Sequence, residues 1–397
     1  MNRHVLGRRL IAGSAAIGAL GPFGMHVLLP ALPAIAVDFT AGASTVQLLV
    51  SLALVAVAFG NLVVAPLSDR FGRRSVIVAG LCLFLTGSLA GLLATSMNML
   101  IAARIVQAFG SGAAMAVALA AITDYFGVGR SANALATMAT AVLVVPMFAP
   151  ILGGFTVESA GWRAAFALAL ALGVVVLYFV LARVEETRGA NRSAGPSLQT
   201  FISYRRLLGS REYLGFVAFG SCMMGAVTVF ITSAPYVAIH VLGVTPSHYG
   251  LLFFLPAFAS FAGFFFTARM AHRLGGLRMM RFGAALSIGG AAALVAGASV
   301  GITHPLALFL PGMLVCGGNA LASPNSTTGA ITSAPDMAGA ASGMLGFIQL
   351  LVGATATQLV AVFANQTPFP LITAIAMLSL GALVPLAYLS RLQLKRG

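Results

Sequence analysis

The sequence predicts an all-α membrane protein of twelve transmembrane helices, folded as two six-helix bundles. Three observations predict this fold class: the composition, the spacing of the apolar runs and the distribution of charge. The 397 residues are 59% hydrophobic and 8% charged, with a mean hydropathy of +1.00. Soluble domains carry about a quarter charged residues, so a chain this apolar must expose much of its surface to lipid.

Twelve apolar runs follow one another, each near the ~20 residues that cross a bilayer as a helix. They are apolar throughout rather than alternating, which excludes an outer-membrane barrel. The first run follows a basic segment, as in a signal peptide, but the further spans favour an uncleaved first helix. We place the spans at residues 10–33, 45–67, 75–94, 97–123, 132–156, 164–182, 213–238, 247–270, 282–301, 305–330, 338–363 and 369–390.

Basic residues gather on one side of the predicted membrane. Of the 22 Lys and Arg residues, 20 lie before span one, after spans two, four, six and eight, or at the C-terminus. Arg163 lies in a loop of the other side, and Arg104 lies inside a span. By the positive-inside rule, both termini face the cytoplasm across a bacterial inner membrane. The formal charge of +14 is therefore a topology signal, and we expect no nucleic-acid partner.

One long polar stretch divides the spans six and six. It predicts a cytoplasmic linker with a short surface helix around 198–208. The halves also echo each other, because SDRFG at 68–72, after span two, is similar to AHRLG at 271–275, after span eight. Parallel repeats of this kind are typical of transporters. We predict three parts: an N-terminal bundle at 1–183, the linker at 184–212 and a C-terminal bundle at 213–397.

The sequence offers little for an enzyme or a metal site. Cys82, Cys222 and Cys316 lie singly in apolar runs, which indicates packing residues rather than a disulfide framework. There is no phosphate-binding GxxxxGK[ST] motif and no nucleophile–base pattern. We expect no cofactor, no metal and no ATP-driven step.

Several motifs resemble a known family, and the resemblance covers essentially the whole chain. APLSDRFGRR at 65–74, between spans two and three, resembles the signature loop of the major facilitator superfamily. RIVQAFGSGAA at 104–114 and PMFAPILGG at 146–154 are similar to elements of its twelve-helix drug:proton antiporters. LPALPAIA at 29–36 and SPNSTTGAI at 323–331 are most similar to the bicyclomycin/chloramphenicol-resistance type.

The loop after span two is predicted to form a conformational latch of Asp69, Arg70, Gly72, Arg73 and Asp124. Gly72 permits a tight turn, and Asp69 can pair with Arg73 one helical turn on. The resemblance implies that Asp69 also faces the start of span eleven near Met337, and that Arg73 meets Asp124. Such contacts would hold the outward-facing state. Alternatively, the loop only supplies positive charge, and Ala65 replaces a glycine of the family pattern.

The fifth span carries Pro146, Pro150, Gly153 and Gly154. Proline bends a helix and glycine lets a neighbouring helix approach closely. The resemblance implies an antiporter motif that makes a tight contact between the halves. An ordinary kinked span is the alternative.

Arg104 and His26 are the predicted proton-coupling residues. Span four begins near Ser96, which places Arg104 roughly 12 Å deep, with Gln107 one turn later. An arginine at this depth marks a pathway, unless it extends back to the interface. His26, four residues before Pro30, is predicted at a similar depth. A neutral histidine bonded to its helix backbone is the alternative.

Apolar side chains with sparse polar groups are predicted to line a substrate cavity, because methionine adapts to varied shapes. Individually, these residues could equally face lipid, pack in the core or tie helices together. The predicted cavity residues are Phe23, Met25, Gln107, Met115, Met147, Met223, Asn319, Asn325 and Gln349.

The resemblance implies a proton-coupled antiporter that exports small amphiphilic xenobiotics or antibiotics, including phenicol-like compounds, by alternating access. A metabolite carrier working by symport or facilitated diffusion is the alternative, because no Asp or Glu lies deep in a predicted span. A non-transporting receptor ranks third, because the linker and tails hold no recognisable domain. We expect a monomer whose partners are a small-molecule substrate, protons and the lipid bilayer.

Overall fold

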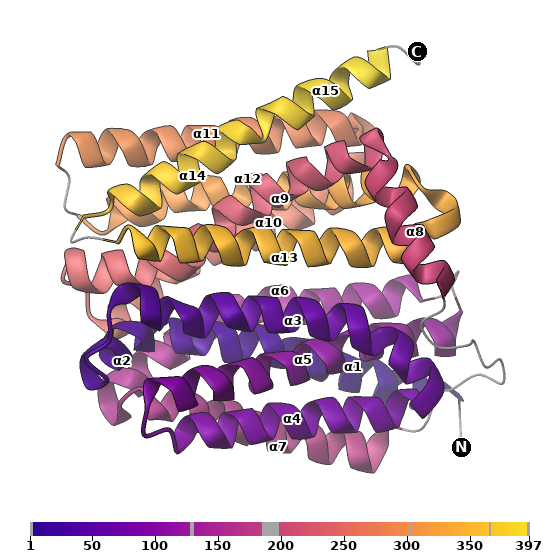
Figure 1. Cartoon of the computed structure of the whole chain (residues 1–397), viewed down its shortest axis with the longest axis horizontal. Helices are drawn as coiled ribbons and strands as arrows, with labels where there is room; N and C mark the ends of the chain where they lie inside the picture. The colour runs from indigo at the N-terminus through magenta and orange to yellow at the C-terminus, as the bar shows by residue number, and fades with distance from the viewer. Residues whose placement is uncertain (1–2, 128–130, 185–197, 302–303, 365–366, 395–397) are drawn as a thin grey trace. The chain divides into compact units, whose positions relative to one another are not determined.

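The computed structural model describes residues 3–127, 131–184, 198–301, 304–364 and 367–394, and in these residues the chain forms helices joined by short turns, with no strand (Figure 1). Twelve of its helical segments are long and apolar enough to cross a membrane, which confirms the predicted number of spans. Part of the predicted linker, 185–197, lies outside the described residues. So do the basic residues Arg130, Arg188, Arg192, Lys395 and Arg396 of the predicted inner side.

The chain divides into two compact units, one formed by Met1–Ala41 with Leu48–Ser197 and the other by Gly42–Gln47 with Leu198–Gly397. The first six spans are built from α1 (Arg3–Leu28), η1 (Leu29–Ala31), α2 (Leu32–Asp38), α3 (Ala43–Phe71), α4 (Arg73–Leu92), α5 (Met97–Phe126), α6 (Ala132–Ala160) and α7 (Arg163–Arg183).

A short helix, α8 (Leu198–Gly209), precedes the last six spans. These are built from α9 (Arg211–Tyr236), η2 (Val237–Val241), α10 (Pro246–Leu274), α11 (Gly276–Ser299), α12 (Leu306–Thr332), η3 (Pro335–Met337), α13 (Ala338–Val362), α14 (Phe369–Gly381) and α15 (Leu383–Leu394).

The first span is longer than predicted, and its two prolines explain why. It continues past residue 33 to Asp38 through the 3-10 turn η1 and the short helix α2. Pro30 and Pro33 are the second residues of η1 and α2, in the first turn, where the backbone N–H has no partner within the helix. The prolines therefore start new helical segments instead of ending the span.

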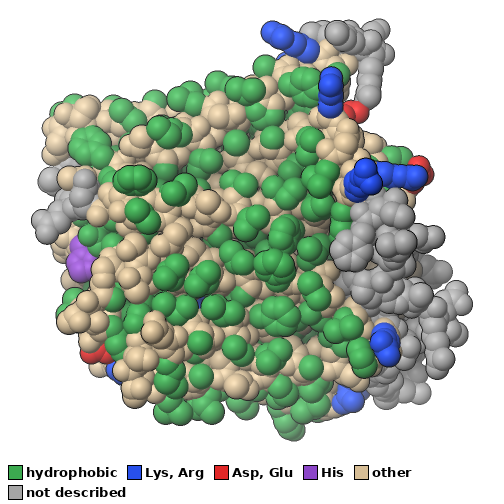
Figure 2. Space-filling view, in the orientation of Figure 1, with side chains coloured by type: hydrophobic (Ala, Val, Ile, Leu, Met, Phe, Trp, Pro, Cys, Tyr) green, Lys and Arg blue, Asp and Glu red, His purple; other side chains and the backbone are tan. Residues whose placement is uncertain are grey.

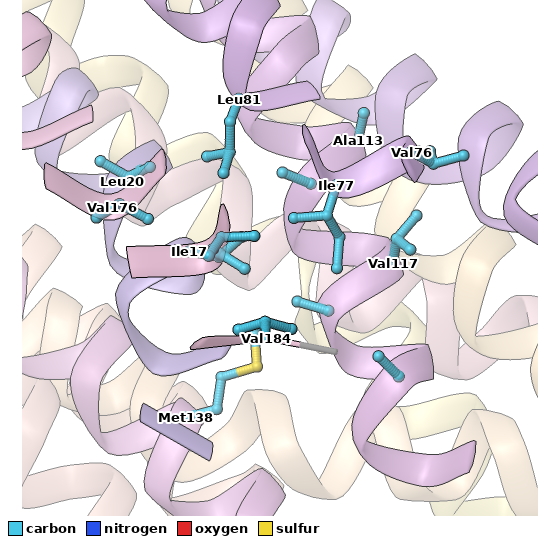
Figure 3. Close-up of a cluster of buried hydrophobic side chains, with 14 of the residues drawn as sticks. Ile17, Leu20, Val76, Ile77, Leu81, Ala113, Val117, Met138, Val176 and Val184 are labelled. Atoms are coloured by element: carbon cyan, nitrogen blue, oxygen red, sulfur yellow. The ribbon is translucent and has the colours of Figure 1, made fainter. Parts of the chain in front are cut away.

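The core of the first unit is a cluster of aliphatic side chains, in which Ile17 and Leu20 of α1 meet Ile77 and Leu81 of α4 and Val117 of α5 (Figure 3). Glycines bring α4 and α5 together. An added Cβ on Gly87 would lie 2.4 Å from the backbone nitrogen of Gln107. This close approach positions the buried polar residues of α5 described below.

In the second unit, α8 packs on the start of α13. Leu207 is fully buried and contacts a cluster that includes Ala341 and Leu345. The other face of α8 exposes Arg205 and Arg206. The short surface helix expected around 198–208 is present as α8, which packs on one end of α13 and α9 (Figure 1).

Hydrophobic side chains cover much of the visible surface, whereas Lys and Arg gather near the helix ends (Figure 2). Lipid must cover that surface, because apolar patches this large are not left in water. Large exposed side chains include Phe155 on α6, Tyr178 on α7, Phe265 on α10 and Val384 on α15.

Candidate functional site

Arg104 lies inside the first unit, on α5. The helix begins where predicted, because the side chain of Ser96 accepts a hydrogen bond from the backbone N–H of Met99. Arg104 follows seven residues after the first helical residue, Met97, or roughly 10 Å along the axis. Its exposed fraction is 3%, so the guanidinium is enclosed by neighbouring helices rather than extended to an interface.

Backbone carbonyl groups of two other helices hold this guanidinium. Nη1 donates to the carbonyl of Gly24 on α1 at 3.3 Å, and Nε donates to the carbonyl of Leu49 on α3 at 3.4 Å. Nη1 also donates to Oε1 of Gln107, one turn along α5, at 2.5 Å. Arg104 therefore joins α1, α3 and α5, and its distances to the two carbonyl oxygens are long for charge-assisted hydrogen bonds.

Gln107 extends the network to α4. Its Nε2 donates to the hydroxyl of Ser88 at 2.7 Å, and that hydroxyl donates to the carbonyl of Phe84 at 2.7 Å. Gln107 is 1% exposed and Ser88 is fully buried. The sequence analysis did not identify Ser88. A single serine in an apolar run is only a weak indication of a buried hydrogen bond.

His26 is 8% exposed on α1, and its Nδ1 donates to the carbonyl of Pro22 at 2.8 Å. The sequence predicts His26 at a depth similar to that of Arg104, and Gly24, two residues before His26, supplies the α1 carbonyl that Arg104 binds. Residues two apart on an α-helix point about 200° apart, so His26 lies on roughly the opposite face of α1 from Gly24. The backbone hydrogen bond foreseen for a neutral histidine is present; whether His26 carries protons stays a prediction.

The proline–glycine element lies in α6, which contains both Pro146 and Pro150. Gly153 and Gly154 are buried, and an added Cβ on Gly153 would lie 2.2 Å from the carbonyl oxygen of Val27. Gly153 therefore brings α6 against the end of α1 within the first unit. The contact between halves that the resemblance implies stays a prediction.

The predicted latch surrounds the turn between α3 and α4. Gly72 has φ +92°, a conformation that favours glycine, and it separates the end of α3 from the start of α4. The chain leaves the helix at this glycine and starts the next helix at Arg73, so the expected pairing of Asp69 with Arg73 stays a prediction. The side chain of Asp69 lies outside the described part of the structure, and Arg70 is exposed beside the ring of Phe71.

Arg73 does pair with Asp124. Its Nε lies 2.8 Å from Asp124 Oδ2, which ties the first residue of α4 to the last turn of α5, and it also hydrogen-bonds Ser68. Arg74 makes contacts that the sequence did not reveal, because it donates to the carbonyls of Leu181 and Val184 at the end of α7, both at 2.9 Å. The start of α4 thus holds the ends of three other helices of its unit.

The predicted cavity residues of the first unit are not alike. Phe23 and Met25 are half-buried on α1, and Met147 on α6 is 7% exposed. Met115 packs against the aliphatic core. No contact among the described residues places these four side chains around one cavity. Their shared role in binding substrate stays a prediction.

In the second unit, two predicted residues have polar atoms without hydrogen bonds in the described structure: Oδ1 of buried Asn319 and Nε2 of Gln349. Gln349 lies against Gly220 of α9, where an added Cβ would be 2.7 Å from its Nε2. Asn325 instead donates to the carbonyl of Leu321 at 2.9 Å, and Met223 is fully buried with Met280. Asn319 and Gln349 thus keep polar atoms without a described hydrogen bond, whereas Asn325 and Met223 make local contacts, and the shared cavity role of all four stays a prediction.

A further cluster, missed in the sequence, explains the isolated Arg163 at the start of α7. Its Nη1 lies 3.3 Å from Asp38 Oδ2, and its Nη2 donates to the carbonyl of Ala94 at 3.0 Å. Trp162 stacks on the guanidinium and donates from Nε1 to the same carboxylate at 2.9 Å. The charge of Arg163 is thus compensated, and the ends of α2, α4 and α7 are joined.

Two units of six membrane-length helices, with polar side chains held inside the spans, define the class of protein as a multi-pass membrane transporter. The model of the Major Facilitator Superfamily matches residues 15–357. The chain belongs to the Major Facilitator Superfamily.

Relatives agree with this assignment. A bicyclomycin resistance protein homolog of Haemophilus influenzae is 26% identical over 94% of this chain and 93% of its own length. A chloramphenicol resistance protein of Pseudomonas aeruginosa is 28% identical over 95% and 90%, respectively. The xylose transporter of E. coli, solved in a partially occluded inward-open conformation, has a TM-score of 0.75 at 14% identity and 97% coverage of both chains. The protein is a transporter and not an enzyme.

Proposed function

We propose that the protein is a proton-coupled antiporter of a bacterial inner membrane that exports small amphiphilic xenobiotics by alternating access, as a monomer. The observation that carries the proposal is the buried network of Arg104, Gln107 and Ser88 inside the spans. A buried charge is costly in a membrane protein, so it is retained where a pathway needs it. The names of the resistance-protein relatives support the choice of xenobiotics, including phenicol-like compounds.

His26 and Arg104 are the proposed coupling residues. Protonation would turn the second ring nitrogen of His26 from a hydrogen-bond acceptor into a donor and would add a positive charge to α1. In the proposed cycle, each export of substrate is coupled to the entry of a proton that His26 binds and releases. The Arg73–Asp124 pair is proposed to act with Asp69 and Met337 as the latch that holds one of the two states. The α6 element around Gly153 is proposed to form a tight contact between the two halves that prevents passive flow through the protein.

The test has two stages. A pump-deficient bacterial host that expresses the protein is exposed to a substrate panel, with an Arg104→Gln variant of equal membrane abundance as the control. Compounds to which only the wild type confers resistance are then followed in proteoliposomes, with and without an imposed pH gradient. Uphill export that requires the gradient supports the proposal, and resistance to none of the panel contradicts it.

A metabolite carrier working by symport or facilitated diffusion is the second candidate. It is favoured by the position of the acidic residues, since the described ones, Asp38, Asp124, Glu158, Glu212 and Asp336, all lie in terminal turns of their segments. Transport that ignores the pH gradient, or that runs inward with it, would select this candidate.

A further inference from the structure

Arg104 is a buried cation without a carboxylate partner among the described residues. Its hydrogen bonds go to two backbone carbonyls and one side-chain amide, none of which carries a net charge. Arginine keeps its charge when buried, and a buried charge is usually paired with an opposite one. Its positive charge is therefore left uncompensated by the neighbouring helices.

A count of donors shows where a partner would bind. The guanidinium has five N–H groups. Nε uses its one donor on Leu49, and Nη1 uses its two on Gly24 and Gln107. Nη2 makes no hydrogen bond with any residue that the structure describes, so both of its N–H groups are available.

The acidic side chains that the structure describes in the first unit do not serve as partners of Arg104. Asp124 lies twenty residues along the same helix, or roughly 30 Å. Asp38 is bound to Arg163 and Trp162 at the end of α2, and Glu158 lies in the last turn of α6. A partner for Nη2 has to come from outside the described part of the first unit.

We propose that the transported compound supplies this partner, and that the site selects organic anions: amphiphilic molecules with a carboxylate or another oxyanion. The inference rests on the proposed export function and narrows its substrate class, because it makes anions the preferred substrates over neutral, phenicol-like compounds. An oxyanion can accept from both N–H groups of Nη2, and such charge-assisted hydrogen bonds are about twice as strong as neutral ones. A cationic drug at this position would instead meet a like charge in a low-dielectric interior.

The residues around Arg104 fix the orientation of its guanidinium. The side-chain Nε2 of Gln107 donates to Ser88, so its Oε1 rather than its Nε2 faces Nη1 of Arg104. Phe84, whose carbonyl accepts from Ser88, is itself buried in the aliphatic core of the first unit, so the turn of α4 that holds Ser88 is anchored there. The site therefore presents a cation held in place by Gly24, Leu49 and Gln107, with the N–H groups of Nη2 left for an anion.

The experiment uses the full-length protein and three probes with one scaffold: tritiated 2-naphthoate, 2-naphthamide and 2-naphthylmethylammonium. Binding affinity is measured on purified protein, and uphill export in a pH gradient is measured in proteoliposomes. Wild type is expected to bind the carboxylate at least tenfold more tightly than the amide and to bind the ammonium most weakly. The affinity ratio tests this inference, whereas gradient-driven export of any probe tests the proposed function.

The decisive variant is Gln107→Glu, which places a carboxylate at the position that already contacts Nη1 and so supplies the missing charge from within. It is expected to lose the preference for the carboxylate, bringing the ratio to about one, while still binding the amide. Arg104→Gln is expected to lose the preference in the same way. Arg281→Gln, an exposed arginine on α11, removes the same charge elsewhere and is expected to match wild type.

Three outcomes would overturn the inference. These are equal binding of the amide and the carboxylate by wild type, an unchanged preference in Gln107→Glu, or binding of none of the probes by folded protein. If the amide is nevertheless exported uphill, the proposed function survives and only the anion selectivity is wrong. Absence of export with an intact affinity ratio contradicts the function instead.

Discussion

Polar side chains inside the spans of the first unit are held by the backbone of neighbouring turns and helices. Arg104 binds the carbonyls of Gly24 and Leu49, and His26 binds the carbonyl of Pro22. A carbonyl oxygen has two lone pairs, so it can accept a side-chain donor while it still serves its helix. Backbone carbonyls therefore satisfy donors of the ionisable groups that are buried here.

The first prediction concerns His26. In the variant His26→Gln, the side-chain amide can still donate a hydrogen bond, but it cannot take up a proton. If His26 is the coupling site, uphill export driven by a pH gradient should fall at least tenfold, while substrate counterflow, which needs no net proton movement, persists. Labelled-substrate transport in proteoliposomes measures both.

The matched control is His240→Gln, because His240 is exposed at the end of η2 and should leave export unchanged. Undiminished gradient-driven export by His26→Gln would leave this histidine as a structural hydrogen-bond donor.

The second prediction concerns Gly153. In Gly153→Ala, the new Cβ would lie 2.2 Å from the backbone oxygen of Val27, so α6 must move away from α1. Overpacking of this kind costs about 1–3 kcal/mol, and the melting temperature of the purified protein should fall. Gly289→Ala on α11 is the control, because nothing lies within 4 Å of the added Cβ and alanine favours helix. A melting temperature that is unchanged in Gly153→Ala would contradict the packing.

At the scale of elements, the start of α4 organises one end of the first unit. Arg73 reaches α5 through Asp124, and Arg74 reaches the last carbonyls of α7. Each charge of the Arg73–Asp124 pair lies at the unfavourable end of its own helix dipole, a cation at an N-terminus and an anion at a C-terminus. Each residue therefore depends on the other to offset its position.

The third prediction follows from that pair. Arg73→Ala and Asp124→Ala should each lower the melting temperature, and the double variant should lose less than the sum of the two. The side chains are 14% and 33% exposed, so the coupling should be modest, about 0.2–1 kcal/mol. Asp124→Ala combined with Arg281→Ala, which lies in the other unit, should be additive. Simple addition in the Arg73–Asp124 cycle would show that the pair is not coupled.

At the scale of the whole molecule, twelve spans return the chain to the side where it began. Arg163, the one loop arginine on the predicted outer side, is bound to Asp38 and stacked on Trp162. Its role is therefore to join helix ends, and it does not weigh against the orientation that the other basic residues indicate.

The fourth prediction tests this topology. Reporter fusions at the N-terminus, at Gln199 in α8 and at the C-terminus should all report the cytoplasm, because the basic loops face it. Fusions at Ala41 and His304, in the turns before α3 and α12, should report the periplasm. A periplasmic signal from the Gln199 fusion would reverse the orientation.

The sequence by itself determined the number of spans and their approximate bounds, because membrane thickness dictates the length and polarity of a spanning helix. It also identified Arg104, with Gln107 one turn later, because a charged residue within an apolar span is costly and therefore rare. The turn at Gly72 could be predicted because few residues besides glycine adopt its backbone conformation.

Only the tertiary structure decided what these residues contact. The acceptors of Arg104 are carbonyls of Gly24 and Leu49, and every residue has a carbonyl, so no sequence pattern marks them. The ties of Arg74 to α7 and of Arg163 to Asp38 span long stretches of chain, and packing geometry alone selects them. Depth along a helix can be counted from the sequence, but the direction of a side chain around it cannot, because direction depends on which neighbouring helices pack there. For that reason the sequence grouped His26 with Arg104, whereas the structure places Gly24 on the face of α1 that contacts Arg104.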